Sequence, residues 1–418
     1  MKLLSACDVT IRGRGRDLFT RGGPLSPPML VSLLLFQTRY GASRGYARMI
    51  EAFWGEAKSH GLELPREEPV TAQAFSDART KLPPDLVRSL LHTAGEGFDE
   101  IHGERFLWRG RRLVAVDGQR RFVQPCEALR RCFGGPAGSH YPMAHVTTLF
   151  DVVSKMPRDA VVGPYGADER VQLSQVLART RTGDVVVLDA GFPSFDVFVM
   201  LLESKLDFVA RVPETGTFAA IMKFLADGGT DGDVVLHPPE GSVLRGGDPI
   251  TVRVLRIPRK GDEAWVLVTT LAREEFPANV VAEAYGLRWP IETFHAALVS
   301  EHFDQGFFHA KWKGGVEQEV YAQALFVAIT RHLMAAATAD EEGPAYEHVS
   351  AKAALLAVGD HLARLVLMQP PERATAHLGQ LLRRIARAIE KPRPGRSFPR
   401  KSLLPGPRWG PAGRRGGA

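Results

Sequence analysis

The strongest constraint on the fold is a short apolar run at residues 184–189, which has the sequence Asp-Val-Val-Val-Leu-Asp. A strand that is apolar on both faces is typical of the middle of a sheet that helices cover on both sides. Helical patterns precede and follow this run, at residues 173–180 and 194–204. Because strands that alternate with helices indicate an α/β core, we expect residues 184–189 to form a central strand of such a sheet.

Further strand patterns lie on both sides of this run. Residues 112–117, 146–153 and 207–212 have the short, apolar and β-branched composition of strands. Turn signals then separate three more strand patterns, so we interpret residues 213–275 as a small β-rich insertion. The predicted strands of this insertion are residues 233–237, 250–257 and 264–271.

Helical patterns dominate both ends of the chain. Those before residue 107 are residues 30–39, 71–82 and 86–98. Residues 278–337 and 350–390 are also predicted to be helical, from their apolar periodicity. We expect Pro290, and the pair Gly314 and Gly315, to interrupt the first of these regions, because proline and paired glycines break helices.

The composition excludes several classes of protein. Of the 418 residues, 44% are hydrophobic and 24% are charged, which excludes a disordered chain, a collagen and a membrane bundle. The net charge of +6 is compatible with a polyanionic partner. Three cysteines in so long a chain argue against a disulfide framework and fit a reducing compartment. The first residues lack the apolar core of a signal peptide, so we expect a cytoplasmic protein without a membrane partner.

Three acidic residues are candidates for catalysis. Asp117 and Asp189 each follow a predicted strand, and carboxylates at strand ends can converge at one edge of a sheet. The third, Glu292, follows Tyr285 and Arg288 at spacings of three and four residues, which place the three on one face of a helix. By contrast, Asp184 precedes its strand, so we interpret it, and Asp151 with it, as turn residues.

Three carboxylates with no cluster of His or Cys nearby favour a hard cation such as Mg²⁺ or Mn²⁺. Two such ions are a common device for phosphoryl transfer, since one activates the attacking oxygen and the other stabilises the leaving oxygen. Arg288, one helical turn before Glu292, could bind a phosphate. The residue types therefore predict chemistry on phosphate esters.

The order and spacing of these motifs resemble those of a DDE transposase of the bacterial insertion-sequence type. More narrowly, the chain resembles the insertion-sequence-four type family, whose third acid lies in a Tyr-x2-Arg-x3-Glu-x6-Lys signature. The matching segments are Val-Ala-Val-Asp-Gly at 114–118, Val-Val-Leu-Asp-Ala-Gly-Phe-Pro-Ser at 186–194, and residues 285–292. Similarity extends to Ala-Phe-Ser-Asp-Ala-Arg at 74–79 and over most of residues 25–400.

This resemblance implies a ribonuclease-H-like catalytic core with a β-rich insertion between the second aspartate and the glutamate. It implies that Asp117, Asp189 and Glu292 are catalytic and hold two Mg²⁺ (or Mn²⁺) ions. It further implies cut-and-paste transposition, in which hydrolysis at the transposon end frees a 3′-OH that then attacks the other strand or target DNA. The partners would be double-stranded DNA, as terminal inverted repeats and target, and a second copy of the chain in the synaptic complex.

Four residues around the third acid are candidate contacts to DNA. We expect Tyr285 and Arg288 to contact the DNA backbone, and Trp289 and His295 to assist them. The signature has Lys seven residues after the glutamate, and this chain has Val299 there. Two interpretations of the function therefore remain open. The chain is either a competent transposase, with His295 supplying part of the missing charge, or a catalytically decayed DNA-binding derivative. A more distant alternative is a metal-independent hydrolase with paired carboxylates, such as a glycosidase.

In the light of this resemblance the patterns divide the chain into six segments. The segments are a mostly helical DNA-binding region at 1–106, a first part of the core at 107–212, the β-rich insertion at 213–275, a second part of the core with the catalytic helix at 276–340, C-terminal helices at 341–390, and a basic flexible tail at 391–418.

Overall fold

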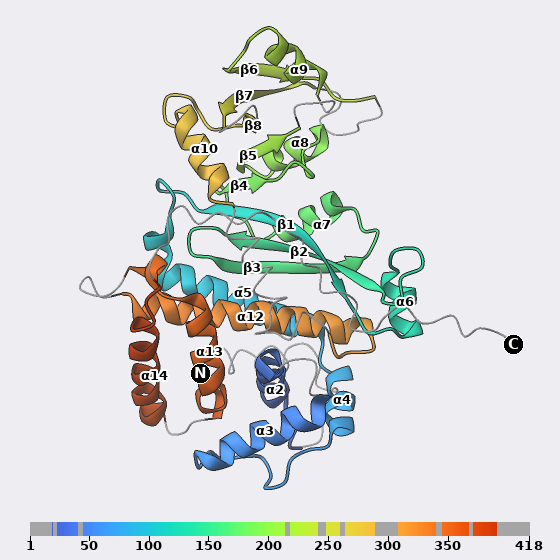
Figure 1. Ribbon diagram of the computed structural model, residues 1–418, viewed down its shortest axis with the longest axis vertical. Coiled ribbons are helices and arrows are strands. Elements are labelled where there is room, and N and C mark those ends of the chain that lie inside the picture. Colours follow the sequence, from blue (N-terminus) through green and yellow to red (C-terminus); the bar gives the residue numbers. More distant parts are fainter. Residues whose placement is uncertain are drawn as a thin grey trace, which may run out of the picture.

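One mixed sheet of eight strands organises the structure, which is a computed structural model (Figure 1). The strands lie in the order β3-β2-β1-β4-β5-β8-β7-β6. The structure describes residues 19, 23–40, 45–213, 218–240, 248–259, 264–288, 308–339, 345–367 and 371–390.

The first five strands have the ribonuclease-H-like arrangement. Strands β1 (Leu113–Phe122), β2 (Met143–Asp151) and β3 (Met156–Pro164) form an antiparallel meander. Strands β4 (Val185–Leu188) and β5 (Asp207–Val212) are parallel to β1. This order confirms the expected fold class, although the sequence did not predict β3.

The three strands of the expected insertion extend this same sheet. They are β6 (Asp231–Leu236), β7 (Ile250–Pro258) and β8 (Ala264–Thr269), close to the predicted bounds. Strand β8 pairs antiparallel with β5, so the sheet continues without a break from the core into the insertion. A short helix that was not predicted, α9 (Ala219–Ala226), packs against β6 at the top of Figure 1.

The central strand β4 is buried on both faces, as its sequence predicts. All four of its side chains are 0% exposed. Val186 and Leu188 pack into a core with α7 (Glu169–Leu177) and α8 (Phe195–Glu203). Val185 and Val187 belong to the other core, which α5 (Pro84–His102), α10 (Ala278–Gly286) and α12 (Lys313–Ala337) help to form. The continuous apolar run is therefore explained by two helical layers, one on each face.

Helices from both ends of the chain surround α12 on the second face (Figure 1). α12 is long and apolar enough to cross a membrane, but 67% of its most apolar stretch is buried inside the fold. Its length and composition are therefore those of a core helix. The remaining elements are α2 (Pro27–Tyr40), α3 (Gly45–Ser59), α4 (Ala72–Thr80), η2 (Gly103–Phe106), α6 (Glu127–Phe133), η5 (Tyr346–His348), α13 (Ala351–Leu367) and α14 (Pro371–Ala386).

The expectation that Gly314 and Gly315 break a helix is wrong, because α12 begins at Lys313 and includes both. The reason for glycine here is close packing. A Cβ on Gly315 would lie 2.6 Å from the Cβ of Ala310 and 2.7 Å from the ring of Trp312. In the first turn of a helix, this gain in packing offsets the weak helix propensity of glycine. The other expected break, Pro290, lies outside the described residues.

A buried guanidinium joins the N-terminal helices to α12. Arg79 in α4 is 0% exposed and forms an ion pair with Glu319 of α12, with 3.0 Å between Nη1 and Oε1. Its Nε donates to Gln318 at 3.0 Å, and its Nη2 donates to the carbonyl of Gly315 at 3.0 Å. Tyr46 in α3 accepts a further hydrogen bond from Nη1 at 2.6 Å. The contacts satisfy the buried charge and fix α3 and α4 against α12.

We expect Arg79→Ala to lower the free energy of unfolding by about 3–5 kcal/mol, because it leaves the buried carboxylate of Glu319 without its counter-ion. Urea unfolding would measure the change. Arg48→Ala, at an exposed position of α3, is the control and should change the free energy by less than about 0.5 kcal/mol. Equal losses in the two variants would contradict the role assigned to Arg79.

Candidate active site

Two of the predicted carboxylates lie side by side at the end of the parallel strand pair. The register of β1 with β4 ends at Val116 and Leu188, and Asp117 and Asp189 are the next residue of each strand. Both aspartates are half-buried. The carboxyl edge of parallel strands is where α/β folds commonly bind ligands. The fold thus brings together two acids that are far apart in the sequence.

Asp117 does not end its strand, and in this respect the sequence-based expectation is wrong. β1 continues to Phe122 because it stays paired with β2, where Asp117 is opposite Thr148. Only the pairing with β4 stops before Asp117. The side chain therefore lies on a strand held on one side by β2 and open on the side where β4 ends. Its Oδ1 accepts a hydrogen bond from the backbone N–H of Gly118 at 3.0 Å.

The end of α10 holds the carboxylate of Asp189. The hydroxyl of Tyr285 donates to Oδ1 of Asp189 at 2.9 Å, and Nη2 of Arg288 lies 3.5 Å from Oδ2. Arg288 is buried, with its guanidinium carbon 5.8 Å from the ring centroid of Tyr285. Tyr285 in turn packs edge-on against Trp265 of β8, with 4.8 Å between ring centroids. The predicted pair Tyr285 and Arg288 is thus assembled on the second aspartate.

These contacts keep Asp189 ionised. Partial burial raises the pKa of its carboxyl, but the backbone N–H of Ala190, the charge of Arg288 and the hydrogen bond from Tyr285 together lower that pKa below its ordinary value. Burial and the neighbouring Asp189 carboxylate raise the pKa of Tyr285 to about 12. At neutral pH Tyr285 is therefore a neutral donor, and Asp189 is an anion that can bind a cation.

Glu292, Trp289, His295 and Val299 all lie outside the described residues. Among the described residues, no group of three or more His, Cys, Asp or Glu is arranged to hold a metal ion. The donor set at the edge is nevertheless two adjacent carboxylates, which suits Mg²⁺ or Mn²⁺ better than a soft metal.

Comparison with known families identifies the family of this chain. A family model described as "Transposase DDE domain" matches residues 108–330, which span β1 to α12 and cover more than half of the chain. The chain belongs to the transposase DDE domain family. This membership implies phosphoryl transfer on DNA, and the family's acids are the residue type found at this edge.

Two further comparisons extend the search to solved structures and to curated proteins. A solved structure described as "Cryo-EM structure of piggyBac transposase synaptic complex with hairpin DNA" is similar at 10% identity and a TM-score of 0.40. The similarity covers 95% of this chain and 84% of that one. A comparison with curated proteins gave no significant match.

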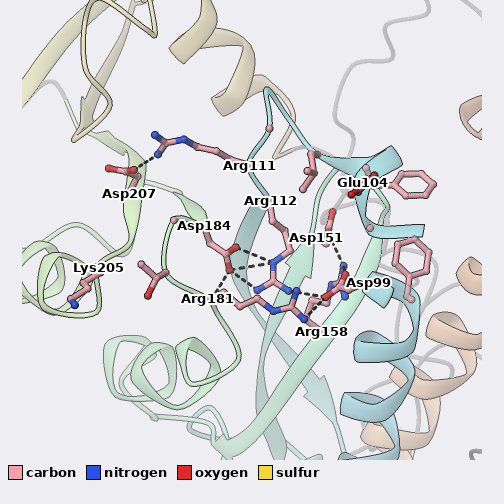
Figure 2. A pocket seen from close by; sticks show the side chains of 17 residues that line it. Asp99, Glu104, Arg111, Arg112, Asp151, Arg158, Arg181, Asp184, Lys205 and Asp207 are labelled. Carbon is pink, nitrogen blue, oxygen red and sulfur yellow. Dashed lines mark hydrogen bonds and ion pairs between the residues drawn. The ribbon is translucent and has the colours of Figure 1, made fainter. Parts of the chain in front are cut away.

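A second charged cluster of the transposase lies at the opposite end of the strands (Figure 2). It lines a cavity of about 700 Å³ where β1 and β4 begin. Arg112 pairs with Asp184 at 2.5 Å, and Arg158 pairs with Asp151 at 2.8 Å. Asp99 of α5 accepts from both arginines and also pairs with the nearby Arg181. Because these charges neutralise one another, the cluster joins α5 to the sheet.

The interpretation of Asp184 and Asp151 as turn residues agrees with this structure. Asp184 accepts a hydrogen bond from the backbone N–H of Arg181 at 2.8 Å, which closes the turn before β4. Asp151 accepts from the backbone N–H of Ser154 at 3.0 Å in the turn that follows β2. The sequence did not predict that both would also form buried ion pairs, since their partners are distant in the chain.

Sequence reasoning also missed His145 and Glu169, which lie beside the carboxylate edge. Nε2 of His145 in β2 is 3.2 Å from Oε1 of Glu169 at the start of α7. The signal that could have indicated them is Gly118, directly after Asp117. A glycine inside a strand often marks a close approach by another group.

We expect Tyr285→Phe to raise the pKa of the Asp189 carboxyl, because the lost hydrogen bond had favoured the ionised form. Carbon-13 NMR titration of the metal-free protein would measure this pKa. Arg288→Gln should shift it in the same direction through the lost charge. Tyr165→Phe is the control, because Tyr165 packs on Arg120 instead, and it should leave the value unchanged. An unchanged pKa in Tyr285→Phe would contradict the described contact.

Proposed function

We propose that this transposase cuts DNA at the ends of its insertion sequence and joins the freed ends to target DNA by a cut-and-paste route. The observation that supports this most directly is the register that sets Asp117 beside Asp189. Membership of the transposase DDE domain family supports chemistry on DNA at this edge. With Glu292 as the third acid, the three carboxylates would hold the two Mg²⁺ or Mn²⁺ ions.

When bound, two such ions activate an attacking oxygen and stabilise a leaving oxygen. The chain's own groups would prepare the site for them. Tyr285 fixes the orientation of the Asp189 carboxylate and keeps it ionised, as the hydrogen bond of 2.9 Å indicates. Arg288 is a buried cation next to this carboxylate, so it would balance the charge before the ions bind and contact a DNA phosphate afterwards.

The reaction would take place in two transfers at phosphorus. In the first, water attacks the phosphodiester at the transposon end and the P–O3′ bond breaks, which leaves a free 3′-OH on the transposon strand and a 5′-phosphate on the flanking strand. In the second, that 3′-OH attacks a target phosphodiester, and the new bond forms as the target's own P–O3′ bond breaks. The first step hydrolyses a phosphodiester, and the second exchanges one phosphodiester for another. Neither step therefore requires an external energy source.

The partners would be terminal inverted repeats, target DNA and a second copy of the chain. The net charge of +6 supports binding to a polyanion. We assign contacts with the DNA backbone to Tyr285 and Arg288, and to Trp289 and His295 next to Glu292 in the sequence. We also propose the six segments of the sequence analysis as the organisation of the protein, with residues 1–106 and the basic residues 391–418 helping to hold the transposon ends.

One observation favours a second candidate function. Val299 occupies the position of the signature Lys, and an isopropyl group cannot bind a phosphate as an ammonium does. A catalytically decayed derivative would retain DNA binding and would regulate transposition rather than perform it. The two candidates differ in cleavage and agree in binding.

A cleavage assay with DNA that carries the inverted repeats flanking the gene separates them. We expect nicking at the repeat boundary with Mg²⁺, none with EDTA, and a loss of at least about 100-fold in Asp189→Asn. The loss should reach this size because even outer-shell groups of metal sites contribute 10–100-fold. Asp227→Asn, at an exposed position after α9, is the matched control and should cleave like the wild type.

The other outcomes are equally informative. DNA binding without cleavage, with cleavage restored by Val299→Lys, would favour the decayed derivative. Cleavage that persists in EDTA or in Asp189→Asn would refute the proposed metal-dependent mechanism. Neither binding nor cleavage of any tested DNA would contradict both candidates.

A further inference from the structure

A contact between His145 and Glu169 lies beside the backbone that carries the two aspartates. His145 in β2 is 1% exposed, and its Nε2 is 3.2 Å from Oε1 of Glu169. Within the described part of the chain, Nδ1 of His145 has no hydrogen-bond partner, so Glu169 is the contact that orients the ring. Glu169 is the first residue of α7, and its side chain is 36% exposed at the same edge.

Both oxygens of Glu169 face glycines that follow the aspartates. A Cβ on Gly118 would lie 2.5 Å from Nε2 of His145 and 3.2 Å from Oε1 of Glu169. A Cβ on Gly191 would lie 3.8 Å from Oε2 of Glu169. The Glu169 carboxylate therefore lies close to the backbone one residue after Asp117 and two residues after Asp189. The motifs Asp-Gly and Asp-Ala-Gly leave room for this pair.

Buried polar contacts keep α7, and therefore Glu169, in place on the sheet. Gln172, one turn after Glu169, is 4% exposed and accepts a hydrogen bond from Thr147 of β2 at 2.7 Å. Its amide also donates to the carbonyl of His145 at 3.5 Å. A Cβ on Gly163 of β3 would lie 2.4 Å from this amide nitrogen, so the helix sits unusually close to the sheet.

The pair acts from the opposite face of the sheet to the aspartates. Side chains alternate along β1, so Asp117 shares the face of Leu113 and Ala115, whereas Gly118 faces α7 with Val114 and Val116. Glu169 therefore reaches the backbone rather than the carboxylate of Asp117. This geometry suits a group that sets positions, because metal sites depend on outer-shell contacts that orient their ligands.

We propose that the His145–Glu169 pair is a positioning element that fixes the separation of Asp117 and Asp189, and so sets the affinity of the site for divalent ions. This inference rests on the proposed function of the two aspartates as metal ligands. Pairing between β1 and β4 ends at Val116 and Leu188, so backbone hydrogen bonds between these strands do not extend to the two aspartates. Glu169 lies near the backbone that follows both of them, and its contact with His145 fixes where its carboxylate lies.

The test measures Mn²⁺ binding to the full chain by electron paramagnetic resonance, without DNA. We expect Glu169→Ala to weaken Mn²⁺ binding about 10–100-fold, the usual cost of an outer-shell partner. Glu169→Gln should stay within about threefold, because its amide oxygen still accepts from His145 and fills the same space. Glu203→Ala is the matched control, an exposed glutamate at the far end of α8 on the same face, and should bind like the wild type.

Gly118→Ala provides a second variant that leaves the charges unchanged. Its Cβ would push His145 away from Glu169, so we expect Mn²⁺ binding to weaken here as well. Thermal unfolding of each variant would be recorded, and binding would be measured well below the transition, so that loss of folding is not mistaken for loss of affinity. Mg²⁺-dependent DNA cleavage should follow the Mn²⁺ affinity in every variant.

Two results would overturn the inference while leaving the proposed function intact. In one, the wild type binds Mn²⁺, Asp189→Asn does not, and Glu169→Ala binds like the wild type. In the other, Glu169→Gln loses as much affinity as Glu169→Ala, which would assign the effect to the charge of Glu169 at the ions. Failure of the wild type itself to bind Mn²⁺ would overturn both the inference and the proposed metal site.

Discussion

Everything at the candidate site depends on the parallel pairing of β1 with β4. Four residue pairs, from Leu113–Val185 to Val116–Leu188, set the register and leave Asp117 and Asp189 as the next residue on each strand. The register is firm because all eight of these side chains are buried, alternately toward the two helical layers. A slip by one residue would turn every apolar side chain to the wrong core and would separate the carboxylates. Apolar packing therefore determines where two like charges meet.

The fold surrounds one of the two aspartates with donors and a cation. Arg288, Tyr285 and the backbone of Ala190 stabilise the charge of Asp189. Asp117 receives the N–H of Gly118. The Asp189 carboxylate is thus held in place and ionised before the cations that would bind it arrive. Preorganisation of this kind lowers the cost of ordering the ligands when the ions bind.

The sequence predicted the parts of this structure that depend on local patterns. The apolar run at Val185–Leu188 identified the central strand, and the spacing from Tyr285 to Arg288 identified the pair that contacts Asp189, although α10 ends at Gly286 and Arg288 follows it. It could not predict partners that depend on tertiary contacts, such as Arg79 with Glu319 or His145 with Glu169. Gly314 and Gly315 misled the analysis for the same reason, since their role is to admit Trp312 and not to end a helix.

The extension of the sheet by β6, β7 and β8 has a mechanical consequence. Backbone hydrogen bonds run without interruption from β6 through β7, β8 and β5 to β4, which carries Asp189 at its end. Trp265 of β8 also touches Tyr285, the donor to Asp189. A tilt of the outer strands would be transmitted through these hydrogen bonds to β4. The position of Asp189 therefore depends on strands β5 to β8 as well as on the pairing of β4 with β1.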